Sequence, residues 1–309
     1  MILEVVKGSL KKGSDKIKSN DIFEKVVPYL FLLPSAIFLI TFTYYPIFRS
    51  FYLSFFEHDL WMPEPQFAGL DNYVQLFNDA LFMRVLRNNV IYLIGTIPVV
   101  IILSLFIAIL INERTRFKEF YEAAAFSPTL IPMAAAAMLW VFLYNPNIGI
   151  INRVLRLFGH PGRAWINSSS TALGSLMVVM IWKNIGYFII LFLAGLQNVN
   201  QSLYESAKIN GANWLQKHRF ITLPLITPTL LFVIIVNIIE SFRVFDIVHI
   251  MTQGGPANAT NVFVYYIYQQ TFRFWNFGLG NALTALLVII LFAIIIVIMR
   301  ALRKYVQYG

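Results

Sequence analysis

Long apolar runs recur along the chain and are separated by shorter polar segments. A membrane-spanning helix needs about 20 apolar residues to cross roughly 30 Å of hydrocarbon, and six runs meet that requirement. The third and fourth runs carry more Gly, Ala, Pro and polar residues, which is typical of spans that face other protein. We therefore expect an all-α membrane protein with six transmembrane helices, at residues 28–48, 89–112, 122–144, 171–196, 223–246 and 278–301.

The basic residues between these runs predict which side of the membrane each connection occupies. Cytoplasmic connections carry an excess of Lys and Arg. With the N-terminus inside, the inside segments hold 15 basic residues and the outside segments hold 7. We therefore expect both termini in the cytoplasm. The expected organisation is a cytoplasmic N-terminal arm at 1–27, a six-span transmembrane domain at 28–301 and a cytoplasmic tail at 302–309.

Composition excludes several classes of protein. Apolar residues make up 58% of the chain and charged residues only 13%, about half the usual share in a globular protein. The absence of Cys excludes disulfides, Cys-based zinc sites and thiol nucleophiles, and the four His form no metal-binding spacing. A net charge of +9 would suggest nucleic acid as a partner of a soluble protein. Here the basic residues lie mainly between apolar runs, so we expect a lipid bilayer as partner, no nucleic acid and no metal.

The connection after the fourth run, at residues 197–228, is the most informative part of the sequence. It is longer than the inside connection at 113–120, and it contains the turn signal Asn210-Gly211 between two helix-forming stretches. Both turn residues tolerate left-handed backbone angles, so we expect a short helix, a turn and a second helix. The residue pattern alone fits a site for another protein and an amphipathic connector lying on the membrane equally well.

Three motifs resemble the permease subunits of binding-protein-dependent ABC importers of the carbohydrate type. Residues 205–228 are similar to the EAA loop of that family, with Ser206 in place of the usual Ala and Asn210 in place of the usual Asp. Residues 67–77 resemble the GL-x-NY segment of sugar-type permeases, and residues 245–266 resemble their FD…MT-x-GGP segment. The nearest resemblance is to the first permease subunits of maltose-type and glycerol-3-phosphate-type importers.

This resemblance implies a type I ABC importer permease fold in the bacterial cytoplasmic (inner) membrane. It also implies a second permease subunit, two ATP-binding cassette ATPase subunits that bind ATP and Mg, and an extracytoplasmic solute-binding protein. The chain has no G-x-x-x-x-G-K-[ST] phosphate loop, so we expect no cofactor and no catalytic residue in it. In the family the EAA loop is a coupling helix that docks on the ATPase, which implies ATPase-coupling roles for Glu205, Ser206, Ala207, Asn210, Gly211 and Ala212.

Polar residues inside the fourth run are candidate contacts with a transported solute, because charges at membrane depth usually face a pore or a partner. Lys183 and Tyr187 are four residues apart and share a helix face, with Asn184 beside them and Gly186 as a candidate loosened turn. The favoured alternative to contact with the solute is that Lys183 pairs with a neighbouring span or extends its charged end to the membrane surface.

The fifth run carries polar residues at three-residue steps. Glu240, Arg243 and Asp246 can neutralise one another as a ladder, which is the slightly favoured interpretation. They can also form a polar wall of the translocation path, where Arg243 could bind a carboxylate or phosphate and so hints at an anionic solute. The complete set of path candidates is Lys183, Asn184, Tyr187, Asn237, Glu240, Arg243 and Phe245.

The sequence thus predicts a permease subunit that forms half of the path for a sugar, oligosaccharide or related solute. The first alternative is an ion-coupled secondary carrier. Such carriers often contain inverted repeats, and we find no convincing repeat between the two halves of this chain. The second alternative is a membrane-embedded enzyme, whose catalytic cluster could only be Glu240, Arg243 and Asp246.

Overall fold

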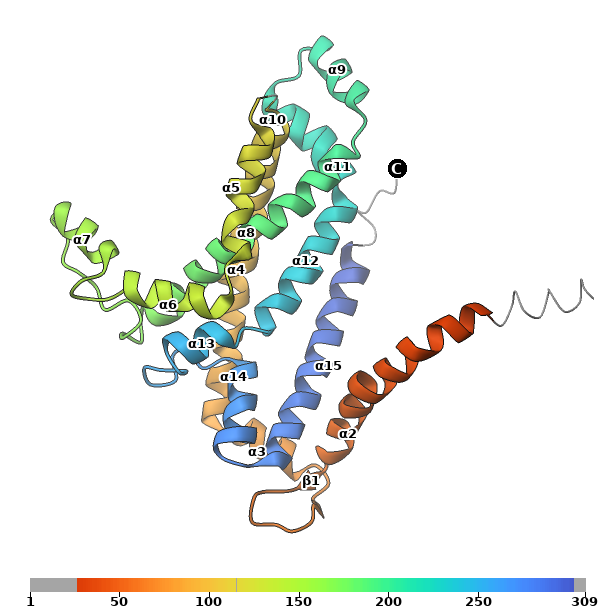
Figure 1. Ribbon diagram of the computed structural model, residues 1–309, viewed down its shortest axis with the longest axis vertical. Helices are drawn as coiled ribbons and strands as arrows, with labels where there is room; N and C mark the ends of the chain where they lie inside the picture. The colour runs from red at the N-terminus through yellow and green to blue at the C-terminus, as the bar shows by residue number, and fades with distance from the viewer. Residues whose placement is uncertain (1–26, 115, 303–309) are drawn as a thin grey trace, which may run out of the picture.

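The computed structural model describes residues 27–302 apart from residue 115, and these residues are mostly helical (Figure 1). The predicted N-terminal arm before Val27 and the predicted tail after Leu302 lie outside the described residues. Four helices in the described part are long and apolar enough to cross a membrane. They are Val27–Leu53, α4 (Ala80–Asn112), α8 (Ala172–Gln197) and α15 (Phe277–Leu302). The first, second, fourth and sixth predicted spans are therefore confirmed, although α4 begins earlier than expected.

The third and fifth predicted spans are each formed by helices that meet at a bend. The third consists of α5 (Lys118–Leu130) and α6 (Met133–Leu143), which meet at 91°. Pro132 causes this break, because a proline disfavours helical backbone angles in the residue before it. Ile131 is accordingly extended, with φ −70° and ψ 130°.

The fifth span bends by 72° between Trp214–Leu225 and Thr227–Met251. Its parts are α10 (Trp214–Lys217), η2 (His218–Thr222), α11 (Leu223–Leu225), α12 (Thr227–Phe242) and α13 (Asp246–Met251). Counting each bent pair as one span gives six in the described residues, in agreement with the six predicted.

The spans α4, α8 and α12 pack together into the main body of the molecule. Phe188 and Phe192 of α8 are buried against Val100 of α4 and Val233 of α12. A second cluster, around Tyr265, joins α6, α8 and α13. The close fit matters because lipid tails are as apolar as the side chains, so helices in a bilayer associate mainly through van der Waals packing.

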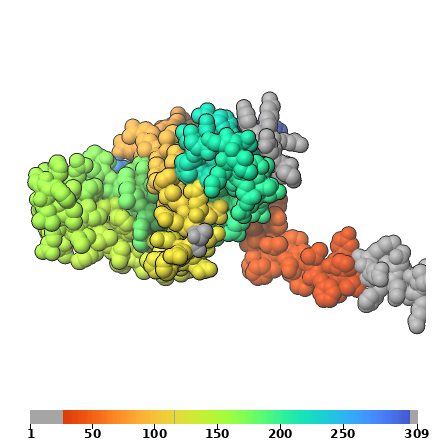
Figure 2. Space-filling model, turned by 90° about the horizontal axis from the view of Figure 1, so that it is seen from above, coloured from red at the N-terminus to blue at the C-terminus, as the bar shows by residue number. Residues whose placement is uncertain are grey.

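The first span differs from the others because none of its most apolar stretch is buried, compared with half of that stretch in α8. It includes a π-helical turn, η1 (Ile40–Tyr44), followed by α2 (Tyr45–Leu53), which packs on α15. The orange-red helix in Figures 1 and 2 extends away from the body. Lipid or another protein must therefore cover this span.

Short elements at the end of the molecule opposite α9 (Gln201–Ile209) connect the spans (Figure 1). They include an antiparallel two-stranded sheet, in which Phe56 pairs with Phe67. These elements are β1 (Phe56–Glu57), β2 (Gln66–Phe67), α3 (Asp71–Asn78), α14 (Phe263–Tyr268) and η3 (Gln269–Arg273). The helix α7 (Ile150–Leu157) projects to one side of the molecule (Figure 1).

The sequence suggested that Gly186 loosens α8. In the structure Gly186 instead allows α5 to approach α8 closely. The helix runs without interruption through this position. A Cβ added at Gly186 would contact the Ala125 carbonyl oxygen and would lie 2.9 Å from the Phe126 Cα. Both are backbone atoms, so a side chain could be accommodated only if the two helices moved apart.

We predict that Gly186→Ala lowers the free energy of unfolding by about 1–3 kcal/mol, the usual range for overpacking. Gly174→Ala in the same helix is the matched control, because a Cβ there has no atom within 4 Å. That variant should gain up to about 1 kcal/mol from helix propensity. Thermal unfolding of the purified proteins in detergent measures both, and equal unfolding temperatures would contradict the prediction.

Candidate functional site

The loop after α8 forms the helix, turn and second helix that the sequence predicts. Asn200 caps the start of α9 by accepting a hydrogen bond from the Ser202 amide. At the other end Gly211 has φ +76°, and the Ala212 amide donates to the Ala207 carbonyl at 2.9 Å. This arrangement is a left-handed helix cap, which glycine adopts without steric strain. Gly211 therefore serves the turn between α9 and α10.

The helix α9 projects from the end of the molecule and has no buried residue (Figure 1). Four of the predicted coupling residues, Glu205, Ser206, Asn210 and Gly211, are exposed, whereas Ala207 and Ala212 are half-buried. Sequence analysis missed Ile209, whose exposed fraction is 86%. An apolar side chain directly before the Asn-Gly turn was the available signal.

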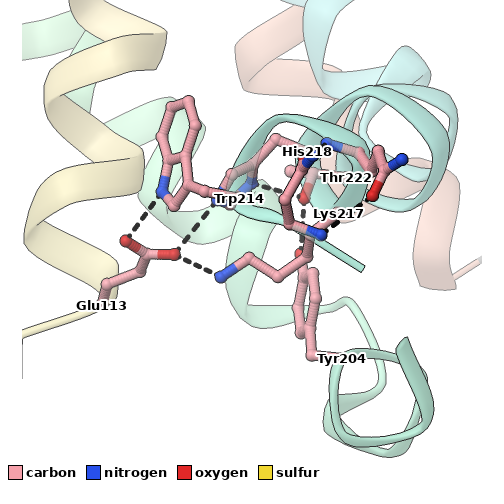
Figure 3. A network of polar contacts seen from close by, with 8 residues as sticks. Glu113, Tyr204, Trp214, Lys217, His218 and Thr222 are labelled. Atoms are coloured by element: carbon pink, nitrogen blue, oxygen red, sulfur yellow. Dashed lines mark hydrogen bonds and ion pairs between the residues drawn. The ribbon is translucent and has the colours of Figure 1, made fainter. Parts of the chain in front are cut away.

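A network of polar contacts connects this loop to the end of α4 (Figure 3). Glu113, which directly follows α4, accepts a hydrogen bond from Trp214 Nε1 at 3.1 Å and forms an ion pair with Lys217. Its Oε1 also lies 3.1 Å from His218 Nε2. The loop after the fourth span is thus attached to the end of the second span.

The network continues from His218 to α9 itself. His218 Nδ1 lies 2.8 Å from the Thr222 hydroxyl, and the Tyr204 hydroxyl lies 3.0 Å from the same oxygen. Lys217 Nζ is 5.7 Å from the centre of the Tyr204 ring. One set of contacts therefore fixes α9, α10 and η2 relative to α4. These residues lie about a hundred positions from Glu113, so no local sequence pattern indicated the network.

The network borders a cavity of about 700 Å³ between α9 and the spans. Glu113, Tyr204, Glu205 and Lys208 are among the residues that line it. Because the network holds α9 along one side of this space, force applied to α9 can pass to α4 and to the start of the fifth span.

The path candidates of the fourth span do not form one polar stripe. Lys183 is 6% exposed, and its Nζ donates to the Thr129 carbonyl oxygen at 2.6 Å. The Thr129 hydroxyl donates back to the Lys183 carbonyl oxygen, so Lys183 holds α8 against α5. Tyr187 is exposed and Asn184 is half-buried.

The path candidates of the fifth span lie around the end of α12. Arg243 Nη1 and Glu240 Oε1 form an ion pair at 3.2 Å, but a three-member ladder on one helix does not form. The reason is that residues 243–245 interrupt the helix and Asp246 begins α13. Asn237 is buried, and its Nδ2 has no hydrogen-bond partner among the described residues.

A small cavity of about 160 Å³ brings several of these residues together. Glu240, Arg243, Phe245 and Asp246 line it, while Phe245 stacks on His249 with ring centres 5.2 Å apart. Of the seven path candidates, this cavity therefore unites Glu240, Arg243 and Phe245. In the described part of the chain, no three His, Asp or Glu side chains are grouped so that they could hold a metal ion.

Comparison with known proteins gives one family and many relatives. Residues 81–307 match the family model described as "Binding-protein-dependent transport system inner membrane component". The chain is 31% identical to the sulfoquinovosyl glycerol transport system permease protein SmoG of Agrobacterium fabrum, with 92% of each chain covered. It is 30% identical to the trehalose/maltose transport system permease protein MalF of Thermococcus litoralis, with 91% of this chain and 95% of the relative covered.

The fold is also similar to that of a solved structure. This structure is a bacterial alginate ABC transporter in complex with an alginate pentasaccharide-bound periplasmic protein. The TM-score is 0.83, with 22% sequence identity, 94% of this chain covered and 98% of the other. At this level of identity the likeness concerns the fold, and it agrees with the fold class predicted from the sequence.

The Glu113 network should make stability depend on pH. Partial burial raises the pKa of Glu113, but hydrogen bonds from Lys217, Trp214 and His218 outweigh it and leave the pKa below its ordinary value. A carboxylate with a depressed folded-state pKa stabilises the protein above its unfolded-state pKa of about 4.3, and this contribution is lost as the pH falls further.

We therefore predict that Glu113→Gln lowers the free energy of unfolding by roughly 1 kcal/mol at pH 7, as expected for a partly exposed ion pair. The difference from the wild type should shrink below about pH 4. Thermal unfolding at several pH values measures both. Glu119→Gln is the control, because Glu119 is exposed and has no ion pair within the described residues. An equal loss at every pH would contradict the role of the charge.

Proposed function

This chain belongs to the family of binding-protein-dependent transport system inner membrane components, and we propose that it forms half of the translocation path of an ATP-driven importer for a sugar-like solute. The proposed assembly contains a second permease subunit, two ATPase subunits that bind ATP and Mg, and a solute-binding protein. The relatives named for sugar and sugar-derivative transport support the class of solute. The same family membership disfavours an ion-coupled carrier.

The observation that carries the proposal is the exposed and braced helix α9. None of its side chains is buried, so they can contact another protein. Glu113 holds Trp214, which follows α9, to the end of α4, and Tyr204 holds α9 itself to Thr222 of the fifth span. A helix that is rigidly held but uncovered can act as a lever when a partner moves it. We propose that an ATPase subunit binds this helix through Glu205, Ser206, Ala207, Asn210, Gly211 and Ala212, together with Ile209.

The proposed membrane orientation follows from this role. Because ATP is available in the cytoplasm, α9 would lie on the cytoplasmic side of the bacterial inner membrane. The larger number of basic residues in the segments on that side supports the assignment. With six spans, both termini would then also be cytoplasmic, including the arm at 1–27 and the tail at 302–309.

The cavity at the end of α12 is the proposed part of the solute path in this chain. Arg243 has an exposed side chain and could bind an acidic group, while Phe245 offers an aromatic face to a sugar ring. Lys183, Asn184, Tyr187 and Asn237 are weaker candidates, since Lys183 and Asn237 are buried in helix packing. The relatives carry names of both a sulfonated and an uncharged solute, so the family does not fix the charge of the solute.

We predict that Ile209→Asp weakens binding of the ATPase subunits and reduces ATP-driven solute uptake by at least tenfold, because it puts a charge where an apolar contact is expected. Co-purification of the ATPase with the tagged chain and uptake by proteoliposomes are the measurements. The control is Leu157→Asp, which makes the same type of change at an 80% exposed residue of α7.

Normal ATPase binding by the Ile209→Asp variant would show that α9 is not the docking element. A second contradictory result would be uptake that continues without any ATPase subunit and is abolished by an uncoupler. That result would show that ATP hydrolysis is not the energy source.

We further predict that Arg243→Ala reduces uptake of an acidic saccharide about tenfold, the loss expected for a charge-assisted contact. Uptake of a neutral saccharide should change less than twofold, and Arg243→Lys should restore part of the loss because the charge remains. Initial uptake rates with a saturating binding protein measure these effects. Equal losses for acidic and neutral solutes would show that Arg243 acts through structure, for instance through its ion pair with Glu240.

A further inference from the structure

A groove at the end of the molecule opposite α9 has no part in the proposed function. It lies between α4 and α8, is bordered by the loop at residues 257–259, and has a volume of about 850 Å³. One face of α4 supplies Arg84, Arg87 and Ile91 to its wall, since residues three and four apart lie on the same side of a helix. The start of α8 supplies Gly174 and Met177.

The groove is basic at its rim and apolar toward its inner end. Among the described residues, Arg84 and Arg87 are the only charged ones that line it, and they precede the apolar stretch of α4 that begins at Val90. Ile91 is one turn further along α4, and Met177 lies one turn beyond Leu173 on α8. The groove thus changes from charged to apolar along the direction that leads into the membrane.

The two arginines keep hydrogen-bonding capacity for a ligand. Arg84 Nη1 donates to the Ala257 carbonyl oxygen at 2.8 Å, which fixes the guanidinium but leaves its other N–H groups available. The side chain of Arg87 is exposed and has no hydrogen bond or ion pair with any described residue. No carboxylate from residues 27–302 lines the groove, so we expect a ligand to neutralise the two positive charges.

The inner end of the groove is closed by helix packing. A Cβ at Gly95 would lie 2.7 Å from the Met177 sulfur atom, so α4 and α8 touch there. Arg87 and Gly95 are about 12 Å apart along the helix axis. The space between these points accommodates a headgroup and the upper part of an acyl chain. Gly174 leaves the groove open, because a Cβ there has no atom within 4 Å.

We propose that this groove binds an anionic phospholipid. Arg84 and Arg87 would bind the phosphate, as guanidinium groups do through paired N–H donors, and the acyl chain would lie against Ile91 and Met177. Basic pockets between membrane helices bind acidic lipid headgroups on the cytoplasmic side of other membrane proteins, and the same chemistry would apply on the side opposite α9. The site does not depend on the solute or on the ATPase.

The test measures binding of dihexanoyl phosphatidylglycerol to the full-length chain in an uncharged detergent by native mass spectrometry. Arg87→Gln should weaken binding about fivefold, the usual effect of one basic residue on an acidic lipid. Arg153→Gln is the matched control, because Arg153 is an exposed arginine of α7 without a partner among the described residues. Equal effects of the two substitutions, or none, would overturn the proposal.

A second variant keeps the charges and fills the groove. Gly174→Leu should abolish binding of the lipid without lowering the unfolding temperature, because the new side chain enters open space. Undiminished lipid binding by this variant would contradict the proposal that the lipid binds in this groove.

Two further ligands separate the sources of the anion. Glycerol phosphate and dihexanoyl phosphatidylcholine should both bind more weakly than the phosphatidylglycerol. If glycerol phosphate binds as tightly, the groove is a site for a free phosphate compound. If Arg87→Gln leaves lipid binding intact but weakens association with the solute-binding protein, the groove is a protein contact. Either result would overturn the lipid site.

Discussion

The packing around α8 is the constraint on which the rest of this structure depends. Glycine at positions 186 and 195 brings the helix against the backbone of α5 and against Thr229 of α12, and Lys183 adds a hydrogen bond to α5. Because apolar side chains gain little by leaving lipid for protein, such close contacts must supply the cohesion of the bundle. The helix break before Pro132 is exposed in this chain, so water or another protein must satisfy its freed backbone groups, because hydrocarbon cannot.

The long helix α4 connects this packed centre to both ends of the molecule. At one end it is followed by Glu113, which holds the segment after α9. At the other end it presents Arg84 and Arg87 beside the start of α8. In the proposed mechanism a displacement of α9 would therefore be passed to a helix that crosses the membrane, whereas a flexible tether would absorb it.

Much of the fold was predictable from sequence because its main determinants are local. Apolar length gave the unbroken spans, and Asn210-Gly211 gave the turn after α9. The bend at Pro132 was foreseeable in principle, since proline restricts its neighbour, but a continuous apolar run concealed it. Two contacts were not foreseeable because they join residues far apart in the sequence. Glu113 and Trp214 are 101 positions apart, and Lys183 and Thr129 are 54 positions apart. Periodicity suggested a ladder on the fifth span, but the interruption at residues 243–245 prevents it.

The exposure of α9 also affects the fate of a subunit that has not yet assembled. The turn after α9 exposes Asn210 and Gly211, and exposed turns of small and polar residues are preferred sites of proteolytic cleavage. In a complete complex the partner on α9 would cover this segment. Unassembled copies would then be degraded faster than assembled ones, and the cell could adjust the number of permease subunits to the number of available partners without a separate regulator.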